Sequence, residues 1–207
     1  MASALTAEVP VTPTPPRPGA IILARHGEPA LSRKVVLSAV EYRAFWKSYE
    51  VLGLLAGQTP PASLVSIAET CGTLVASTRL RSIESARALT GGRVFAQEAM
   101  LVEAPLPPPA WPAWIRLSPK LWGFFARFWW WFFNHHEGQE TRSQAEARAE
   151  RAAAMLEGLA AQGQDVVVLA HGFFNFMIGR ALRRRGWRLT ASEGYKYWST
   201  RRFERLG

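Results

Sequence analysis

The stretch AIILARHGEPALSR, residues 20–33, places an arginine, a histidine, a glycine and a glutamate directly after an apolar run. A short apolar run that is bounded by polar turn residues predicts a buried strand. Strands often end at polar turns, so these residues alone indicate only where the strand ends. A chemical role for Arg25 and His26 depends on partners that the rest of the chain supplies.

The composition predicts one folded domain. A chain of 207 residues, 48% of them hydrophobic, can bury one sizeable core. The single cysteine, Cys71, excludes an internal disulfide and a cysteine-built metal site, and it fits a reducing compartment. We therefore expect a cytoplasmic protein.

The net charge of +9 favours an anionic partner, which could be a phosphorylated small molecule, nucleic acid or an acidic membrane surface. Arginines cluster near the C-terminus, in residues 179–188 and 199–207. A solvated helix end accounts for such a cluster, because arginines there suit the helix dipole. No aromatic–basic RNA-binding signature accompanies it, so we expect no nucleic-acid partner.

The first 18 residues differ in composition from the rest of the chain. Residues 1–18 are rich in proline and lack periodicity, which predicts a disordered tail, and they lack the basic start and apolar stretch of a secretory signal. Residues 19–207 are then expected to form the single domain.

From Ala20 onward, strand and helix patterns alternate, which predicts an α/β sandwich with a mostly parallel sheet between helices. Active sites in such folds lie beyond the carboxyl ends of the strands, and both RHG and the later HG follow an apolar run. The expected strands are residues 20–24, 72–78, 93–97 and 165–170, with a short one within 195–203, and the expected helices are 36–55, 61–71, 81–92, 141–164 and 173–185.

Two of these helices have candidate core faces. The inward positions expected in the first helix are Val40, Ala44, Trp46, Tyr49 and Leu52, and those in the last are Phe174, Met177, Ile178, Ala181 and Leu182.

An aromatic insertion, about residues 104–137, interrupts the alternation with five prolines in its first nine residues and six tryptophans in all. Its run LWGFFARFWWWFF is too short for a transmembrane helix and contains Arg127. Three interpretations stay open: a cap helix over the pocket, a dimer or partner interface, and a peripheral membrane contact through Trp111–Phe133. The adjacent His135 and His136 could not share a metal from one helix face, so we expect no metal site.

Three motifs in order resemble the histidine phosphatase superfamily, also called the phosphoglycerate-mutase-like family. They are LARHGE (23–28), STRLRSIESA (77–86) and VVVLAHG (166–172), each at or after a predicted strand. The resemblance covers most of the chain from Ile21 to the region after His171. It implies a three-layer phosphoglycerate-mutase-like fold, with the aromatic insertion as a cap.

The resemblance also implies a site. His26 would attack phosphorus as the nucleophile, and Arg25, Arg81 and His171 would bind the phosphate. Such chemistry needs positioned positive charge around the equatorial oxygens, which arginine supplies in a planar fork. Arg79 competes with Arg81 for this role, but the serines around Arg81 stand at the family's spacing. Gly27 would let the backbone approach the phosphate.

A carboxylic acid should protonate the leaving group. In many family members this is a glutamate some twenty-odd residues after the pocket arginine, which implies Glu103; Glu98 and Glu28 are the alternatives. The family often has threonine after RHGE and asparagine three positions later, where this chain has Pro29 and Ser32. Ser32 could still donate a hydrogen bond to phosphate.

The resemblance implies a metal-independent histidine acid phosphatase-type hydrolase of phosphomonoesters that needs no cofactor. A catalytically silent member that binds a phosphorylated ligand is the first alternative, with the insertion contacting a protein or membrane, and a phosphomutase is the second. The tryptophans of the insertion could line an apolar pocket for a hydrophobic or lipid-like phosphoester.

Overall fold

The computed structural model describes residues 17–205. Most of the tail that was expected to be disordered, residues 1–16, lies outside the described part. The assignment of residues 19–207 to a single domain stays a prediction.

Six strands form the central sheet, and they are β1 (Ile21–Arg25), β2 (Thr73–Ser77), β3 (Ala96–Glu98), β4 (Val166–Ala170), β5 (Arg188–Ser192) and β6 (Thr200–Glu204). Their order across the sheet is β3-β2-β4-β1-β6-β5. The first four are parallel, and β6 runs antiparallel to both β1 and β5. The mostly parallel sheet is confirmed. Strand β5 was not predicted, because its residues are almost all exposed or half-exposed and carry no apolar run.

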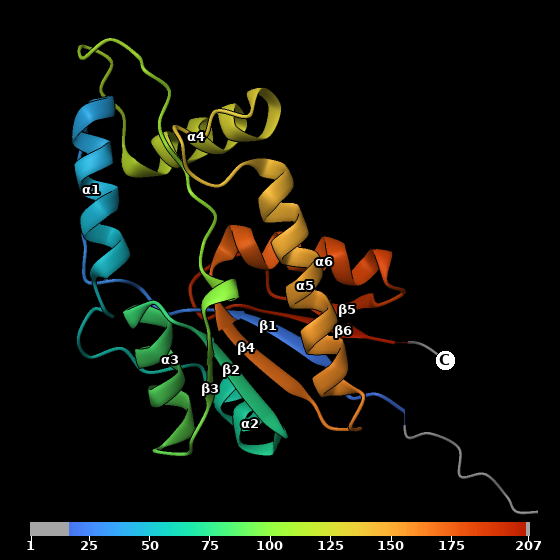
Figure 1. The fold of residues 1–207 in the computed structure, drawn as a ribbon. Coiled ribbons are helices and arrows are strands. Elements are labelled where there is room, and N and C mark those ends of the chain that lie inside the picture. Colours follow the sequence, from blue (N-terminus) through green and yellow to red (C-terminus); the bar gives the residue numbers. More distant parts are fainter. Residues whose placement is uncertain (1–16, 206–207) are drawn as a thin grey trace, which may run out of the picture.

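The helices are α1 (Ala39–Val51), α2 (Ala62–Thr70), α3 (Leu80–Thr90), α4 (Pro119–Phe133), α5 (Arg142–Ala160) and α6 (Gly172–Arg184), with a 3₁₀ turn η1 at Ala99–Leu101. Helices α5 and α6 cover one face of the sheet, and α2 and α3 cover the other (Figure 1). The predicted three-layer sandwich is therefore confirmed.

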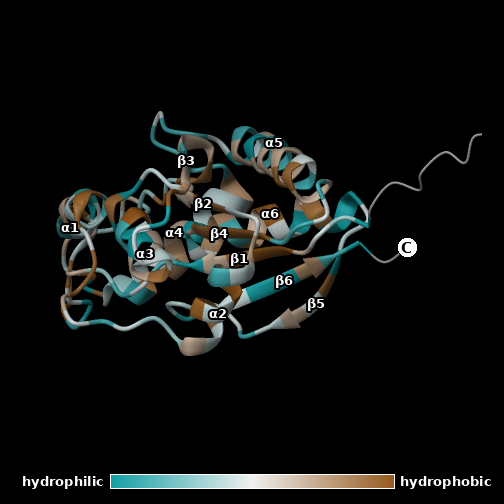
Figure 2. Cartoon of the chain, turned by 90° about the horizontal axis from the view of Figure 1, so that it is seen from below, coloured by the Kyte–Doolittle hydropathy of each residue, from teal (hydrophilic) through white to brown (hydrophobic). Residues whose placement is uncertain are grey.

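Strand β1 shows how the pattern of the sequence builds both layers. Its side chains alternate between the two faces of the sheet. Ile21 and Leu23 join the core beneath α5 and α6, whereas Ile22 and Ala24 join the core beneath α2 and α3. Because both faces are covered, the strand reads as a continuous apolar run. Figure 2 shows the hydrophobic residues gathered on the central strands β1 and β4.

The core face predicted for α6 is confirmed, since all five of its expected positions are buried. The face predicted for α1 is wrong in part. Tyr49 is buried as predicted, and Trp46 and Leu52 are half-buried, but Val40 is 69% exposed, Ala44 is also exposed, and the buried Tyr42 was not predicted. The reason is that α1 stands away from the sheet and packs its Tyr42 face on Trp122 of α4 (Figure 1).

The aromatic insertion folds as a cap built on α4. The Ser118 side chain accepts a hydrogen bond from the Leu121 N–H, and Pro119 occupies the first turn, where its missing N–H costs nothing. Trp122 and Trp130 are fully buried, and the Trp130 indole donates to the Glu140 carbonyl at 3.0 Å. The cap interpretation is confirmed.

The outer face of α4 is apolar and exposed, with Phe132 65% accessible. A contact of this face with a second copy or with a membrane stays a prediction. Within residues 17–205, no helix combines the length and the apolar character that a bilayer crossing requires.

The packing of α4 can be tested by a pair of substitutions on one helix. Trp130→Ala removes a fully buried indole, so we expect it to lower the free energy of unfolding by about 3–5 kcal/mol. Phe132→Ala removes an exposed ring and should cost less than about 1 kcal/mol. Urea unfolding measures both, and equal costs would contradict a docked cap.

Candidate active site

Two parallel neighbours, β1 and β4, end side by side and bring two histidines together. His26 follows β1 and His171 follows β4, and the His26 N–H donates to the Ala170 carbonyl at 3.0 Å. The ring centroids of the two histidines lie 5.1 Å apart, edge to face. Both side chains are buried, with His26 2% exposed.

The hydrogen bonds of His26 define its tautomer. Its Nδ1 lies 2.7 Å from the Gly27 carbonyl oxygen, which can only accept, so Nδ1 carries the proton. Its Nε2 therefore has a lone pair, which accepts from Arg81 Nε at 3.3 Å. Burial, followed by the charges of Arg81 and Arg25, holds the pKa of His26 well below its ordinary value. The imidazole is consequently neutral near pH 7, with Nε2 as its nucleophilic atom.

Arg81 lies in the first turn of α3 and is completely buried. One of its terminal nitrogens donates to the Tyr49 and Glu50 carbonyls, at 2.9 and 3.3 Å. The other donates to the Glu50 carboxylate at 2.9 Å and to His171 Nδ1 at 3.2 Å. With His26 as a further acceptor, the guanidinium links α3, both histidines and the end of α1. A phosphate that binds Arg81 must replace some of these acceptors.

His171 is held from both sides of its ring. Because Nδ1 accepts from Arg81, Nε2 carries the proton and donates to Ser77 Oγ at 2.9 Å. Burial, then the Arg81 charge and His26, lowers the pKa of His171 well below its ordinary value. Ser77 stands at the end of β2, so three adjacent strand ends contribute to this cluster.

Gly27 is required for packing, and its expected role in letting the backbone approach a phosphate stays a prediction. A Cβ atom at this position would overlap the indole ring of Trp198. The Gly27 N–H donates to Ser85 Oγ at 2.9 Å, and Ser85 donates in turn to the Arg81 carbonyl. Glycine is therefore needed here for close packing of the turn.

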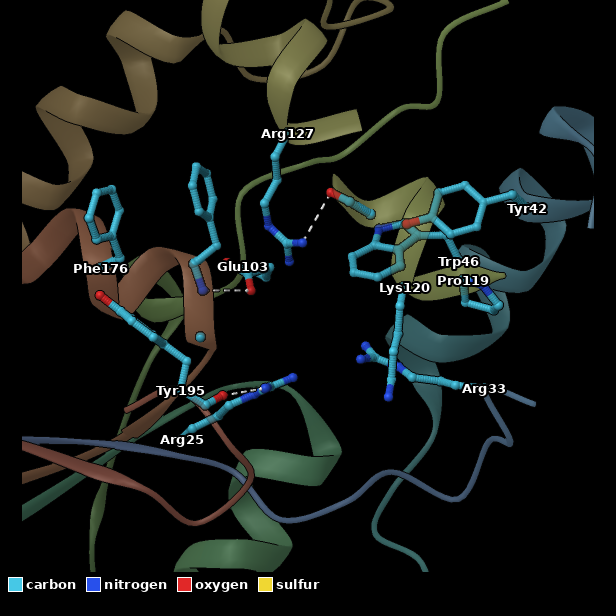
Figure 3. Close-up of a pocket in the computed structure, with 13 residues that line it drawn as sticks. Arg25, Arg33, Tyr42, Trp46, Glu103, Pro119, Lys120, Arg127, Phe176 and Tyr195 are labelled. Atoms are coloured by element: carbon cyan, nitrogen blue, oxygen red, sulfur yellow. Dashed lines mark hydrogen bonds between the residues drawn. The ribbon is translucent and has the colours of Figure 1, made fainter. Parts of the chain in front are cut away.

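A cavity of about 550 Å³ reaches the chain neighbours of the two histidines, although neither histidine is among its lining residues. Its lining includes Arg25 and Gly172, the chain neighbours of His26 and His171, together with Glu103 (Figure 3). Arg25 donates to the Tyr195 carbonyl at 2.7 Å and stacks on the Tyr197 ring, with 4.3 Å between guanidinium carbon and ring centroid. The cavity gives a substrate a place beside the buried histidines.

Glu103 lies where α6 begins. Its carboxylate accepts from the Phe174 N–H at 2.8 Å and from the Phe173 N–H at 3.3 Å. Two free N–H groups of a helix N-terminus favour a carboxylate in this place. Glu103, the residue predicted as the acid, thus lies in the cavity wall. It contacts the backbone of α6 two and three positions after His171.

The structure brings together Arg25, His26, Arg81, His171 and Glu103, but not Ser32. Ser32 is exposed, and its Oγ accepts from the Lys34 N–H, whereas its neighbour Arg33 lines the cavity. Its role as a phosphate ligand stays a prediction without structural support.

The alternative residues lie outside the histidine cluster. Arg79 is half-buried and pairs with Glu50 at 2.6 Å. Glu28 is exposed, and Glu98 ends the short edge strand β3.

Sequence reasoning missed Glu50, Arg33, Lys120 and Arg127. Glu50 contacts Arg81 across 31 positions of the chain, and no local motif marks it. Lys120 and Arg127 belong to the insertion, where isolated charges among aromatic residues form no motif that marks a binding site.

The two buried histidines predict a pH dependence of stability. Both pKa values are lowered in the folded state, so below about pH 6.5 the unfolded chain binds more protons than the folded one. The free energy of unfolding should therefore decrease from pH 7.0 to pH 5.5, by at most about 1.4 kcal/mol per pH unit for each histidine. Urea unfolding at the two pH values measures this, and His171→Gln should reduce the dependence. A dependence equal to that of the unsubstituted chain would contradict the assignment.

No family model matches the chain, and no curated protein matches it. Solved structures do. A phosphoserine phosphatase mutant from Entamoeba histolytica in complex with phosphoserine is 12% identical, with a TM-score of 0.51 and 80% of each chain covered. The product of the open reading frame Rv3214 from Mycobacterium tuberculosis is 18% identical, with a TM-score of 0.49, over 91% of this chain and 97% of that one. A mycobacterial glucosyl-3-phosphoglycerate phosphatase complexed with VO3 is 17% identical, with a TM-score of 0.45, over 80% of this chain and 81% of that one. With its mostly parallel sheet covered by helices on both faces, the chain has the same phosphoglycerate-mutase-like fold as the Entamoeba phosphatase.

Proposed function

We propose that the chain is a phosphomonoester hydrolase that acts through a phosphohistidine on His26. The observation that carries the proposal is the Nε2 atom of His26. This atom has a lone pair, which accepts from Arg81 Nε, in a neutral ring whose orientation is held by the Nδ1–H bond to Gly27. A neutral imidazole held in one tautomer is a competent nucleophile. The phosphoserine bound to the Entamoeba relative supports a phosphomonoester as the substrate class.

In the first step, His26 Nε2 attacks phosphorus, so that an N–P bond forms as the P–O bond of the ester breaks. Arg25, Arg81 and His171 surround the place where negative charge spreads over the equatorial oxygens. Glu103, in its protonated form, gives its proton to the departing oxygen.

In the second step, water attacks the phosphohistidine while the Glu103 carboxylate takes one of its protons. The N–P bond breaks, inorganic phosphate leaves, and His26 returns to its neutral form. No electron is transferred, so the reaction needs no redox cofactor.

The hydrogen bonds that Arg81 already makes also fit the catalytically silent alternative. Its donors already have acceptors from Glu50, Tyr49 and the two histidines, and His26 is almost completely buried. Catalysis requires the end of α1 to release part of this arrangement. A silent member would bind phosphate or vanadate without turnover of any phosphoester, and a phosphomutase would interconvert isomers when given a phosphate donor.

The nucleophile is tested by phosphate release from 4-nitrophenyl phosphate in the presence of a chelator. His26→Ala removes the attacking atom, so we expect kcat to fall at least about a thousandfold. His135→Ala is a suitable control, because His135 does not line the cavity. Full activity of His26→Ala would refute the proposal.

The acid role of Glu103 is tested with two leaving groups. An alkoxide needs a proton as it departs and 4-nitrophenolate does not, so Glu103→Gln should lower kcat/KM, which reports the first step and not hydrolysis of the phosphohistidine, about 100-fold on an alkyl phosphate and less than tenfold on 4-nitrophenyl phosphate. Glu98→Gln provides the control. Equal losses on both substrates would show that Glu103 only supports the start of α6.

A further inference from the structure

The cavity beside the histidines contains more positive charge than one phosphate requires. Four cationic side chains line it, and Glu103 is the one carboxylate among its lining residues. Figure 3 shows the charged groups of these four side chains pointing into a common space. Arg127 extends into it from α4, and Arg25 extends into it from the end of β1. Lys120 and Arg33 lie on the wall opposite Glu103 (Figure 3).

These cations have only neutral acceptors. Arg127 donates to the Gly123 carbonyl, Arg33 to the Tyr49 hydroxyl and Arg25 to the Tyr195 carbonyl. Among the residues from 17 to 205, no carboxylate forms an ion pair with any of the four. Glu103 itself is engaged by two N–H groups of α6.

Arg127 gives the clearest sign that a negative charge is missing. Burial lowers its pKa, Glu103 and Tyr42 partly oppose that effect, and the charges of Arg25 and Arg33 add to it. Arg127 is half-buried, and a cation that is partly removed from water without an ion pair is costly, so a bound anion offsets that cost. The electrostatics of the cavity therefore match an anionic ligand.

The cations divide into two groups by position. Arg25 adjoins His26, where the transferred phosphoryl group would lie. Lys120 and Arg127 belong to the cap, and Arg33 follows the nucleophile turn, so these three approach the cavity from other sides (Figure 3). One phosphoryl group held at His26 would contact Arg25. It would leave Lys120, Arg127 and Arg33 to bind a second anion.

The remaining walls are aromatic. Tyr42 and Trp46 form one side, with their ring centroids 6.2 Å apart, and Phe173 and Phe176 stack on the other at 6.0 Å. A volume of about 550 Å³ lies within the range of small-molecule sites, whose walls are mostly apolar with a few placed polar groups.

We infer that the substrate is a phosphomonoester that carries a second anionic group on an apolar or aromatic body. Arg33, Lys120 and Arg127 bind the second anion, and the aromatic walls hold the body between it and the phosphoryl group. This inference rests on the proposed hydrolase function and narrows its substrate class.

The test compares 4-carboxyphenyl phosphate with 4-carbamoylphenyl phosphate, which match in size and differ in charge. We expect kcat/KM to favour the carboxylate at least tenfold. Lys120→Met and Arg127→Met should each reduce this ratio at least threefold, because each removes a charge-assisted contact. Arg151→Met removes an exposed arginine of α5 and should leave the ratio unchanged. A ratio near one in the unsubstituted enzyme, or a ratio that Lys120→Met leaves intact, would overturn the inference.

A binding measurement separates this inference from the proposed function. Calorimetry on His26→Ala would compare 4-carboxybenzylphosphonate with its carbamoyl analogue, and neither can be turned over. Tighter binding of the carboxylate, weakened by Lys120→Met, would support the second anion site even if no hydrolysis is found. Equal affinities, or no binding of either compound, would refute it whatever the catalytic result.

Discussion

The buried guanidinium of Arg81 is the group on which the arrangement of the site depends. A completely buried charge is tolerated only when acceptors surround it. Arg81 finds these acceptors in His26, His171, the backbone carbonyls at the end of α1 and the Glu50 carboxylate. Elements far apart in the chain are therefore linked to one side chain of α3.

The same charge sets the chemistry of the histidines. A cation in contact with Nε2 of one ring and Nδ1 of the other disfavours a proton on either atom. Together with burial, it keeps both rings neutral and leaves a lone pair on His26 Nε2. In the proposed mechanism, the nucleophile and the environment of the phosphoryl group thus depend on one set of contacts.

The link to α1 also explains the position of the cap. Glu50 and Tyr49 attach the end of α1 to Arg81, while Tyr42 packs on Trp122 of α4. Helix α1 thereby connects Arg81 to the insertion that supplies Lys120 and Arg127. A ligand that spans the cavity would contact both ends of this connection. Release of Arg81 by Glu50 and binding of a second anion by the cap can therefore occur in one event.

The central sheet and the residues at its strand ends were predictable because their signals are local. A buried parallel strand is a continuous apolar run, and RHG and AHG follow such runs directly, so His26 and His171 could be placed at one edge of the sheet. The resemblance to a known family added Arg81 and Glu103.

Features that depend on distant contacts were not predictable. The buried face of α1 is determined by a helix of the insertion, so the assumption of packing on the sheet assigned Val40 and Ala44 wrongly. Glu50 and Arg127 have no flanking motif. Glu50 pairs with Arg81, 31 positions away, and Arg127 meets the other residues of the cavity wall only in the folded chain. The unpaired cations of the cavity became visible only when their side chains could be placed together.

The most direct test of the account is to trap the covalent intermediate. The protein would be quenched in alkali, where phosphohistidine is stable, during turnover of 4-nitrophenyl phosphate, and its intact mass and peptides would be measured. The account predicts a mass increase of one phosphoryl group, located on His26 and absent from His26→Ala. A phosphoryl group on another residue, or undiminished turnover by His26→Ala, would contradict it.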